Sequence, residues 1–150
     1  MADNKKKNFY ITTPIYYASG NIHIGHTYCC VCAATIARYK RLAGYNVRFM
    51  TGSDEHGQKI QEKAEACGLD PQTYVDNIAK SFKDVWKALD ISYDYYVRTT
   101  DDYHVALVQK VFTELLEKGD IYLGEYKGWY CTPDETVWSD CQVITDDNGN

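Results

Sequence analysis

The chain has 150 residues, of which 45% are hydrophobic and 25% are charged, and its formal net charge is −5. These proportions are typical of a folded soluble protein and exclude a wholly disordered chain, a collagen-like repeat and a membrane protein. No apolar run approaches the roughly 20 residues of a membrane-spanning helix. The first residues also lack the apolar stretch of a secretory signal, so we expect a cytoplasmic protein with no membrane partner.

Charge is distributed unevenly along the chain. Residues 1–50 carry a net charge of +6, residues 51–100 carry −3, and residues 101–150 carry −8. The acidic last third argues against a broad nucleic-acid-binding face there, because phosphate contacts need Lys and Arg. The basic first third is compatible with a ligand that bears phosphate groups.

The first predicted elements form a βαβ unit. Residues 9–13 are aromatic and β-branched and stop at a proline, which predicts a strand. Residues 25–43 favour a helix that Gly44 ends, with basic residues in its last turns. Residues 45–50 alternate like a second strand. This order of strand, helix and strand predicts an α/β fold with parallel strands.

The later elements are helices followed by short strands. A short helix is expected over residues 58–67, and a strongly amphipathic one begins at Asp70-Pro71. The apolar side chains of this second helix recur at steps of three and four: Tyr74, Val75, Ile78, Phe82, Val85, Trp86 and Leu89. Residues 93–97 alternate like a strand, and residues 101–118 predict a further helix. Short strands are expected over residues 121–123 and 126–130.

Six cysteines occur in the chain, and we expect them to be reduced thiols, as in other cytosolic proteins. Three of them, Cys29, Cys30 and Cys32, crowd the first predicted helix. A metal site is one interpretation of this cluster. We interpret them instead as small buried hydrophobic side chains.

Two histidines at the expected start of the first helix carry the strongest chemical signal. His23 and His26 lie three residues apart, with Gly25 between them. A helix N-terminus offers unpaired N–H groups and a positive dipole end, which favour an anion such as a phosphate. The imidazoles would donate to phosphate oxygens, and the glycine would let a flat ligand approach the backbone. The alternative is that both histidines only cap the helix.

The segment around these histidines resembles the class I aminoacyl-tRNA synthetases. Residues 23–26 read His-Ile-Gly-His, which is a signature of that class. The other matching segments are similar to methionyl-tRNA synthetases in particular: Thr12–Tyr17, Thr51–Gly57, Gly119–Tyr122 and Gly128–Cys131. The resemblance covers nearly all of residues 8–145.

This resemblance implies a fold and a reaction. Residues 1–118 would form the first half of a Rossmann-like nucleotide-binding fold. Residues 119–150 would begin an inserted connective domain of the zinc-knuckle type. The enzyme would be a methionine–tRNA ligase that joins methionine to ATP as methionyl-adenylate and transfers it to tRNA(Met). Mg²⁺ would accompany ATP, and the tRNA would bind largely through parts outside this chain.

The resemblance also implies roles for individual residues. His23 and His26 would be catalytic, contacting the ATP phosphates, and Gly25 would let adenine approach. Ile15 and Tyr17 would line the methionine site.

Asp54 would hold the ammonium group of methionine. Independently of the resemblance, Asp54 lies just past the predicted second strand, where open α/β sheets place their ligands. A carboxylate there can pair with an ammonium group through a charge-assisted hydrogen bond. The alternative is an ordinary turn or cap aspartate.

Cys131 and Asp134 stand where the family often has the first Cys-x-x-Cys pair of a zinc knuckle. A carboxylate can ligate zinc, so the two would form half of a site. The alternative is a knuckle that lost its metal and kept the turn. Cys141 does not stand where the family has its second pair.

Two rival functions remain open. One is another class I synthetase for leucine, isoleucine or valine, and the other is a non-catalytic binding module with a nucleotide-binding fold. The second class I signature, Lys-Met-Ser-Lys-Ser, does not occur in these 150 residues. We therefore expect the chain alone to be inactive.

Overall fold

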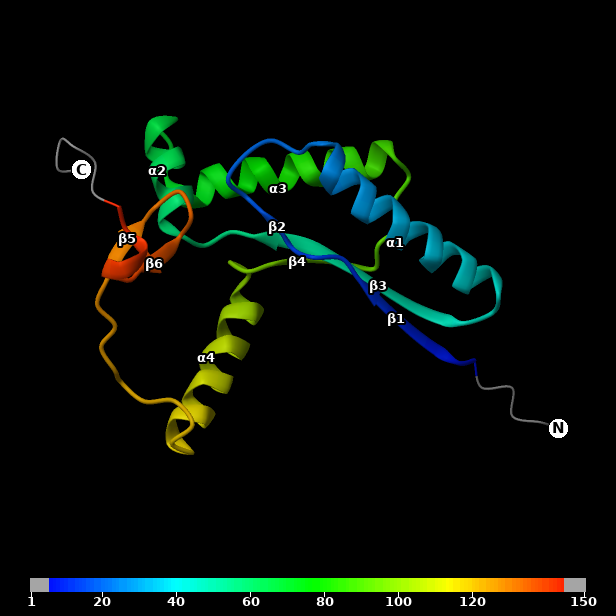
Figure 1. Ribbon diagram of the computed structural model, residues 1–150. Coiled ribbons are helices and arrows are strands. Elements are labelled where there is room, and N and C mark those ends of the chain that lie inside the picture. Colours follow the sequence, from blue (N-terminus) through cyan, green and yellow to red (C-terminus); the bar gives the residue numbers. More distant parts are fainter. Residues whose placement is uncertain (1–5, 145–150) are drawn as a thin grey trace. The chain divides into compact units, whose positions relative to one another are not determined.

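The computed structural model describes residues 6–144, which form two compact units that divide between Val105 and Ala106 (Figure 1). The first unit contains, in chain order, β1 (Asn8–Thr12), β2 (Tyr16–Tyr17), α1 (Ile24–Leu42), β3 (Asn46–Asp54), α2 (Gln58–Ala66), α3 (Pro71–Ala88) and β4 (Tyr95–Arg98). The division falls within α4 (Asp102–Glu117), and the remaining elements are β5 (Trp129–Cys131), β6 (Thr136–Trp138) and the short 3-10 helix η1 (Asp140–Gln142). The domain boundary expected after residue 118 stays a prediction.

The sheet of the first unit is parallel and centred on β3. β1 and β2 pair with one edge of β3, and β4 pairs with the other edge. Thr12 lies opposite Met50, whereas Tyr16 lies opposite Ser53, so the segment between β1 and β2 holds one extra residue. The parallel sheet with its connecting helices confirms the predicted α/β fold.

Both long helices of this unit, α1 and α3, lie along the same side of the sheet (Figure 1). This arrangement follows from right-handed crossovers that move across the sheet in one direction, from β1 to β3 and then to β4. The core between the two helices and the sheet contains Tyr16, Cys30, Ala33, Ala34, Ala37, Val47, Phe49, Phe82, Trp86 and Ile91. A smaller cluster joins α2 and α3: Ala18, Ile60, Ala64, Tyr74 and Val75.

The predicted helix ends are confirmed in detail. After α1, the N–H of Gly44 donates to Arg41 and the N–H of Tyr45 donates to Lys40, the pair of bonds that defines a Schellman motif. Gly44 has φ of 84°, which a side chain would strain. At the start of α3, the Asp70 carboxylate accepts from the backbone N–H of Thr73 at 3.0 Å.

The interpretation of the three clustered cysteines as buried is wrong for two of them. Cys30 is fully buried in the core, but Cys29 and Cys32 are exposed. The two exposed cysteines lie three residues apart and share the face of α1 that points away from the sheet. All six cysteines are free thiols.

The second unit contains a small antiparallel hairpin of β5 and β6, in which Trp129 lies opposite Trp138. The strand predicted over residues 121–123 is wrong, since that segment is irregular and belongs to no strand among the described residues. The strand predicted over 126–130 begins later, at Trp129. None of the helices in residues 6–144 is long and apolar enough to cross a membrane.

Candidate functional site

The carboxyl ends of β2 and β3 bring two of the predicted site residues together. Tyr17 and Asp54 are opposite each other in the parallel register, and the N–H of Ala18 donates to the Asp54 carbonyl at 2.8 Å. Asp54 itself is the last residue of β3, not a residue beyond its end. The strand is longer than the sequence predicts because β4 and β2 pair with its second half.

The first turn of α1 holds the two histidines in a reciprocal capping arrangement. The Nδ1 atom of His23 accepts from the backbone N–H of Gly25 at 3.1 Å. In return, the Nδ1 atom of His26 accepts from the backbone N–H of His23, also at 3.1 Å. The two rings stack with their centroids 3.8 Å apart. The capping alternative is therefore correct as a description of the local geometry.

This capping also determines which nitrogen of each ring remains available as a donor. A neutral imidazole that accepts at Nδ1 carries its proton on Nε2. His23 and His26 therefore present two Nε2–H donors, and neither has a hydrogen-bond partner in residues 6–144. Burial, together with the neighbouring His23, lowers the pKa of His26 below its ordinary value. His26 can thus donate to an anion as a neutral group.

Gly25 makes the capping geometry possible. A Cβ atom at this position would lie 3.0 Å from Cε1 and 3.1 Å from Nδ1 of His23. A larger residue would push the imidazole away from the backbone N–H that it accepts from. Glycine at this position thus has a structural reason in addition to any contact with a ligand.

Tyr16 is a residue of the site region that the sequence does not single out. It is buried, and its ring lies 5.1 Å from the ring of His26, 5.7 Å from that of Phe82 and 5.7 Å from that of Trp86. Burial raises the pKa of Tyr16 to about 12, so the ring stays neutral. Tyr16 thus connects β2, the helix α3 and the histidine turn. Ile15, just before β2, is 42% exposed.

A second group that the sequence does not indicate surrounds Glu55. The Glu55 side chain is fully buried, and Arg98 Nε donates to both of its carboxylate oxygens, at 2.8 and 3.0 Å. Arg98 also binds Asp76 of α3 at 2.6 Å, a hydrogen bond that lowers the pKa of Asp76. No local pattern identifies this cluster, since its members are 22 and 43 residues apart in the chain.

The two residues predicted as half of a zinc site do lie together in the second unit. The Cys131 thiol donates to the Asp134 carboxylate at 3.2 Å across the turn between β5 and β6. Cys141 instead lies 3.1 Å from the hydroxyl of Ser139. Within residues 6–144, no group of three or more His, Cys, Asp or Glu side chains lies close enough together to hold a metal ion.

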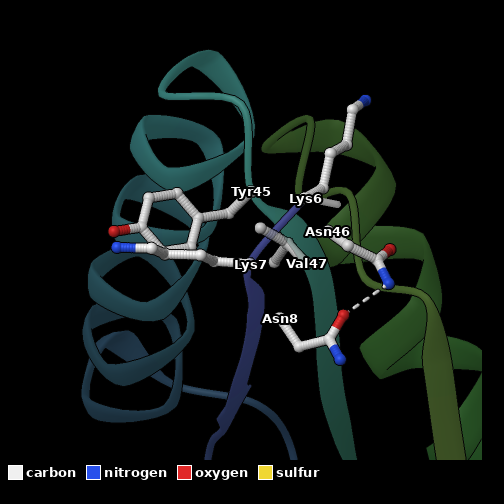
Figure 2. A pocket seen from close by; sticks show the side chains of 6 residues that line it. All are labelled: Lys6, Lys7, Asn8, Tyr45, Asn46 and Val47. Atoms are coloured by element: carbon white, nitrogen blue, oxygen red, sulfur yellow. Dashed lines mark hydrogen bonds between the residues drawn. The ribbon is translucent and has the colours of Figure 1, made fainter. Parts of the chain in front are cut away.

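A cavity in the first unit lies at the amino-terminal ends of β1 and β3, whereas Tyr17 and Asp54 lie at the carboxyl ends of β2 and β3. It is lined by Lys6, Lys7, Asn8, Tyr45, Asn46 and Val47. Figure 2 shows the Asn46 amide turned toward Asn8, to which it donates at 2.9 Å. None of the predicted site residues lines this cavity, so it is separate from the candidate site.

Comparison with known proteins places this chain in one enzyme family. The family model described as tRNA synthetases class I (M) matches residues 9–146. A methionine–tRNA ligase of Caldanaerobacter subterraneus subsp. tengcongensis is 59% identical over 139 residues, covering 93% of this chain and 22% of the relative. The methionine–tRNA ligase of Clostridium tetani is 59% identical over 138 residues, covering 92% of this chain and 22% of the relative. The chain thus spans about a fifth of the length of these curated relatives.

Solved structures show the same fold. Mycobacterium tuberculosis methionyl-tRNA synthetase in complex with methionyl-adenylate is 38% identical, with a TM-score of 0.87, over 94% of this chain and 28% of that one. A LeuRS–tRNA–LeuAMS ternary complex from Agrobacterium radiobacter K84 is 28% identical, with a TM-score of 0.80, over 97% of this chain and 19% of that one. With the family model matched over residues 9–146, this chain belongs to the class I tRNA synthetases (M).

Proposed function

We propose that this chain is the part of a cytoplasmic methionine–tRNA ligase that binds ATP and methionine. The full-length protein would join methionine to ATP, releasing pyrophosphate, and then transfer the methionyl group from the adenylate to tRNA. The substrate carboxylate is the attacking group, so no side chain of the chain has to act as a nucleophile. Catalysis by these residues would consist of positioning and charge stabilisation.

The Nε2–H donors of His23 and His26, which have no hydrogen-bond partner in residues 6–144, are the observation that carries this proposal. Both stand at the N-terminus of α1, where the helix dipole favours an anion. In our proposal they bind the phosphate oxygens of ATP and stabilise the charge that develops at the α-phosphorus. ATP would enter as its Mg²⁺ complex. Gly25, which has no Cβ, would lie against the adenine.

The methionine side of the site would be formed at the carboxyl ends of β2 and β3. Asp54 would pair with the ammonium group, and Ile15 and Tyr17 would line the pocket. The Asp54 carboxylate makes no hydrogen bond or ion pair with other described residues, which supports a role toward a ligand. A carboxylate without such a partner contributes little to folding, whereas its pairing with an ammonium would be charge-assisted.

The degree of sequence identity to known synthetases favours methionine over the rival amino acids as the substrate. The chain is 59% identical to the two methionine–tRNA ligases above and 28% identical to the LeuRS chain. A binding module without catalysis is disfavoured by the same identity, because both of these relatives are ligases.

Isotopic ATP–pyrophosphate exchange by the full-length protein tests the proposal. Exchange should depend on methionine and not on leucine, isoleucine or valine. His26→Ala and His23→Ala should each slow adenylate formation at least about tenfold, the scale of one lost charge-stabilising donor, with much less effect on methionine affinity. His104→Ala, a histidine on α4, serves as the control. An unchanged rate in His26→Ala would refute the assignment.

For the second unit, we propose that Cys131 and Asp134 are two ligands of a zinc site whose other ligands lie outside residues 6–144. The Cys131–Asp134 hydrogen bond alone can close the turn, which is the metal-free alternative. Metal analysis of the full-length protein distinguishes the two. Cys131→Ser should lower the zinc content, and Cys67→Ser should not. Equal zinc content in both variants would favour the metal-free turn.

A further inference from the structure

The buried carboxylate of Glu55 is fully hydrogen bonded. Its Oε1 atom accepts from the Ser53 hydroxyl at 2.5 Å and from Arg98 Nε at 2.8 Å. Its Oε2 atom accepts from the Thr100 hydroxyl at 2.5 Å and from Arg98 Nε at 3.0 Å. A charged group with no exposed surface is expensive to bury unless such bonds compensate for its lost hydration. The four hydrogen bonds thus compensate for the burial of the carboxylate, which lies directly next to Asp54 in the chain.

These bonds hold both neighbours of Asp54 in the chain. Ser53 is bound through its hydroxyl to Glu55, and the backbone N–H of Glu55 donates to the Thr99 hydroxyl at 2.9 Å. Side chains alternate between the faces of a strand, so Asp54, the last residue of β3, is directed to the face opposite Ser53; Glu55 follows the strand and is bonded on the Ser53 side. The face with Ser53 and Glu55 is the buried one.

The same carboxylate ties β3 to the end of β4 and to α3. Arg98 is the last residue of β4, and its guanidinium spans from Glu55 to Asp76. A planar guanidinium with several fixed donors holds this geometry more rigidly than a single hydrogen bond would. The last residues of β3 are thereby held from two elements at once.

We infer that Glu55 is a positioning residue that holds Asp54 in place for the methionine ammonium group. The inference rests on the proposed function, since it gives Asp54 its ligand. Glu55 lies on the side of the backbone opposite the Asp54 side chain. It therefore acts on the ligand only through the position of Asp54. An ion pair needs accurate placement to be effective, because a shift of about 1 Å weakens a positioned contact strongly.

A second ion pair in the same unit provides the matched control. Asp94 binds Arg41 of α1 at 2.9 Å, and its carboxylate also accepts from the backbone N–H of Phe49 at 2.7 Å. Like Glu55, Asp94 connects an arginine with β3. Asp94 contacts β3 at Phe49, which lies five residues before Asp54, in the first half of the strand. Asp94→Asn should therefore cost stability without affecting methionine binding.

Calorimetric titration of the full-length protein with methionine, and separately with ATP, tests the inference. Glu55→Gln should weaken methionine binding about tenfold. ATP binding should stay within about twofold, and Asp94→Asn should change neither affinity. Equal losses for methionine and ATP, or the same methionine loss in Asp94→Asn, would show a general structural role and overturn the inference.

A double-mutant cycle with Asp54→Asn gives the decisive readout. If Glu55 acts through Asp54, adding Glu55→Gln to Asp54→Asn should weaken methionine binding by less than about twofold more. Full additivity of the two changes overturns the inference. If Asp54→Asn alone leaves methionine binding unchanged, the assignment of Asp54 in the proposed function fails, and that result is recognised independently of Glu55.

Thr100→Val is the milder variant for the case in which Glu55→Gln does not fold. It removes one hydroxyl donor to Glu55 and leaves the Glu55–Arg98 pair in place. It should weaken methionine binding about threefold, and this loss should disappear in the Asp54→Asn background. Unchanged methionine binding in Thr100→Val would overturn the inference.

Discussion

The two histidines at the start of α1 have a structural role and, in our proposal, a chemical one. The Nδ1 atoms of His23 and His26 accept backbone N–H groups that the helix leaves unpaired. This use of one nitrogen leaves the other as a donor with a defined direction. Protonation of the His26 Nδ1 atom would remove the acceptor of the His23 N–H and break that half of the cap.

The pKa of His26 predicts the sign of the pH dependence of this turn. It lies below the ordinary value in the folded protein, so the unfolded or locally opened chain binds the proton more readily. The contribution of His26 to stability is therefore fully present above pH of about 6.5 and decreases as the pH falls through the lowered pKa. Amide hydrogen exchange in the first turn of α1 should show more opening at pH 5 than at pH 7.5, after correction for intrinsic exchange.

His26→Gln is the control for this prediction. Glutamine at the third helical position can accept from the N-cap backbone N–H without titrating. The variant should keep the turn closed and lose most of the pH dependence. The same pH dependence in His26→Gln as in the unchanged protein would contradict the role of His26.

Asp54→Asn is the second prediction at the scale of a residue. The substitution keeps the shape of the side chain and removes the charge that pairs with an ammonium group. Methionine binding should weaken by about 1.5–3 kcal/mol, the usual contribution of a hydrogen bond to a charged group, and ATP binding should be nearly unchanged. Calorimetric titration measures both. A loss of ATP affinity with methionine binding intact would place Asp54 on the nucleotide side.

At the scale of elements, β3 organises the first unit because it pairs on both sides. Its central residues contact both neighbours: the Thr51 hydroxyl lies 2.8 Å from that of Thr13, and Gly52 lies opposite Val97 of β4. The backbones of β3 and β4 approach so closely at Gly52 that a Cβ atom there would lie 2.1 Å from the carbonyl oxygen of Val97. Glycine is therefore required at this position by the pairing itself.

Gly52→Ala should strongly destabilise the protein. The added methyl group cannot be accommodated without separating β3 from β4, which we expect to cost about 3 kcal/mol or more. The midpoint of thermal unfolding of the full-length protein measures the effect. The matched control is Gly20→Ala, since a Cβ atom at Gly20 would lie 3.8 Å from its nearest neighbour, Lys63 Nζ. Equal midpoints for the two variants would contradict the predicted clash.

For the molecule as a whole, the 150 residues correspond to 22% of the length of the methionine–tRNA ligases they match. The described part of the chain leaves apolar surface unpaired. No residue of α4 is buried, and Leu107, Val108 and Phe112 are each more than half exposed. Exposed apolar side chains in such a row favour association with further polypeptide.

We therefore predict that the isolated 150-residue chain has no measurable methionine-dependent ATP–pyrophosphate exchange. The Lys-Met-Ser-Lys-Ser signature that would bind the leaving pyrophosphate does not occur in it, and we expect it to fold poorly or to bind its ligands weakly. The purified chain should be compared with the full-length protein in the same exchange assay. Robust exchange by the isolated chain would mean that the second signature is dispensable.

Local signals in the sequence were sufficient for the helices and for the helix N-terminus at which the two histidines lie. Gly44 ends α1, and Asp70 begins α3, because caps and left-handed turns involve residues only a few positions apart. The placement of His23 and His26 at a helix N-terminus follows from the same short-range chemistry. The period of α3 likewise predicts its buried residues Phe82 and Trp86.

Only the tertiary structure decided the features that depend on distant partners. β3 continues to Asp54 because β2 and β4 supply pairing partners from elsewhere in the chain. The burial of Glu55 depends on Arg98, 43 residues away, and an isolated acidic residue after a strand is otherwise typical of the surface. Hydrogen bonds within one turn depend on residues that are close in the sequence, so the sequence predicts them. Contacts that close long loops depend on how the whole sheet is assembled, so only the tertiary structure shows them.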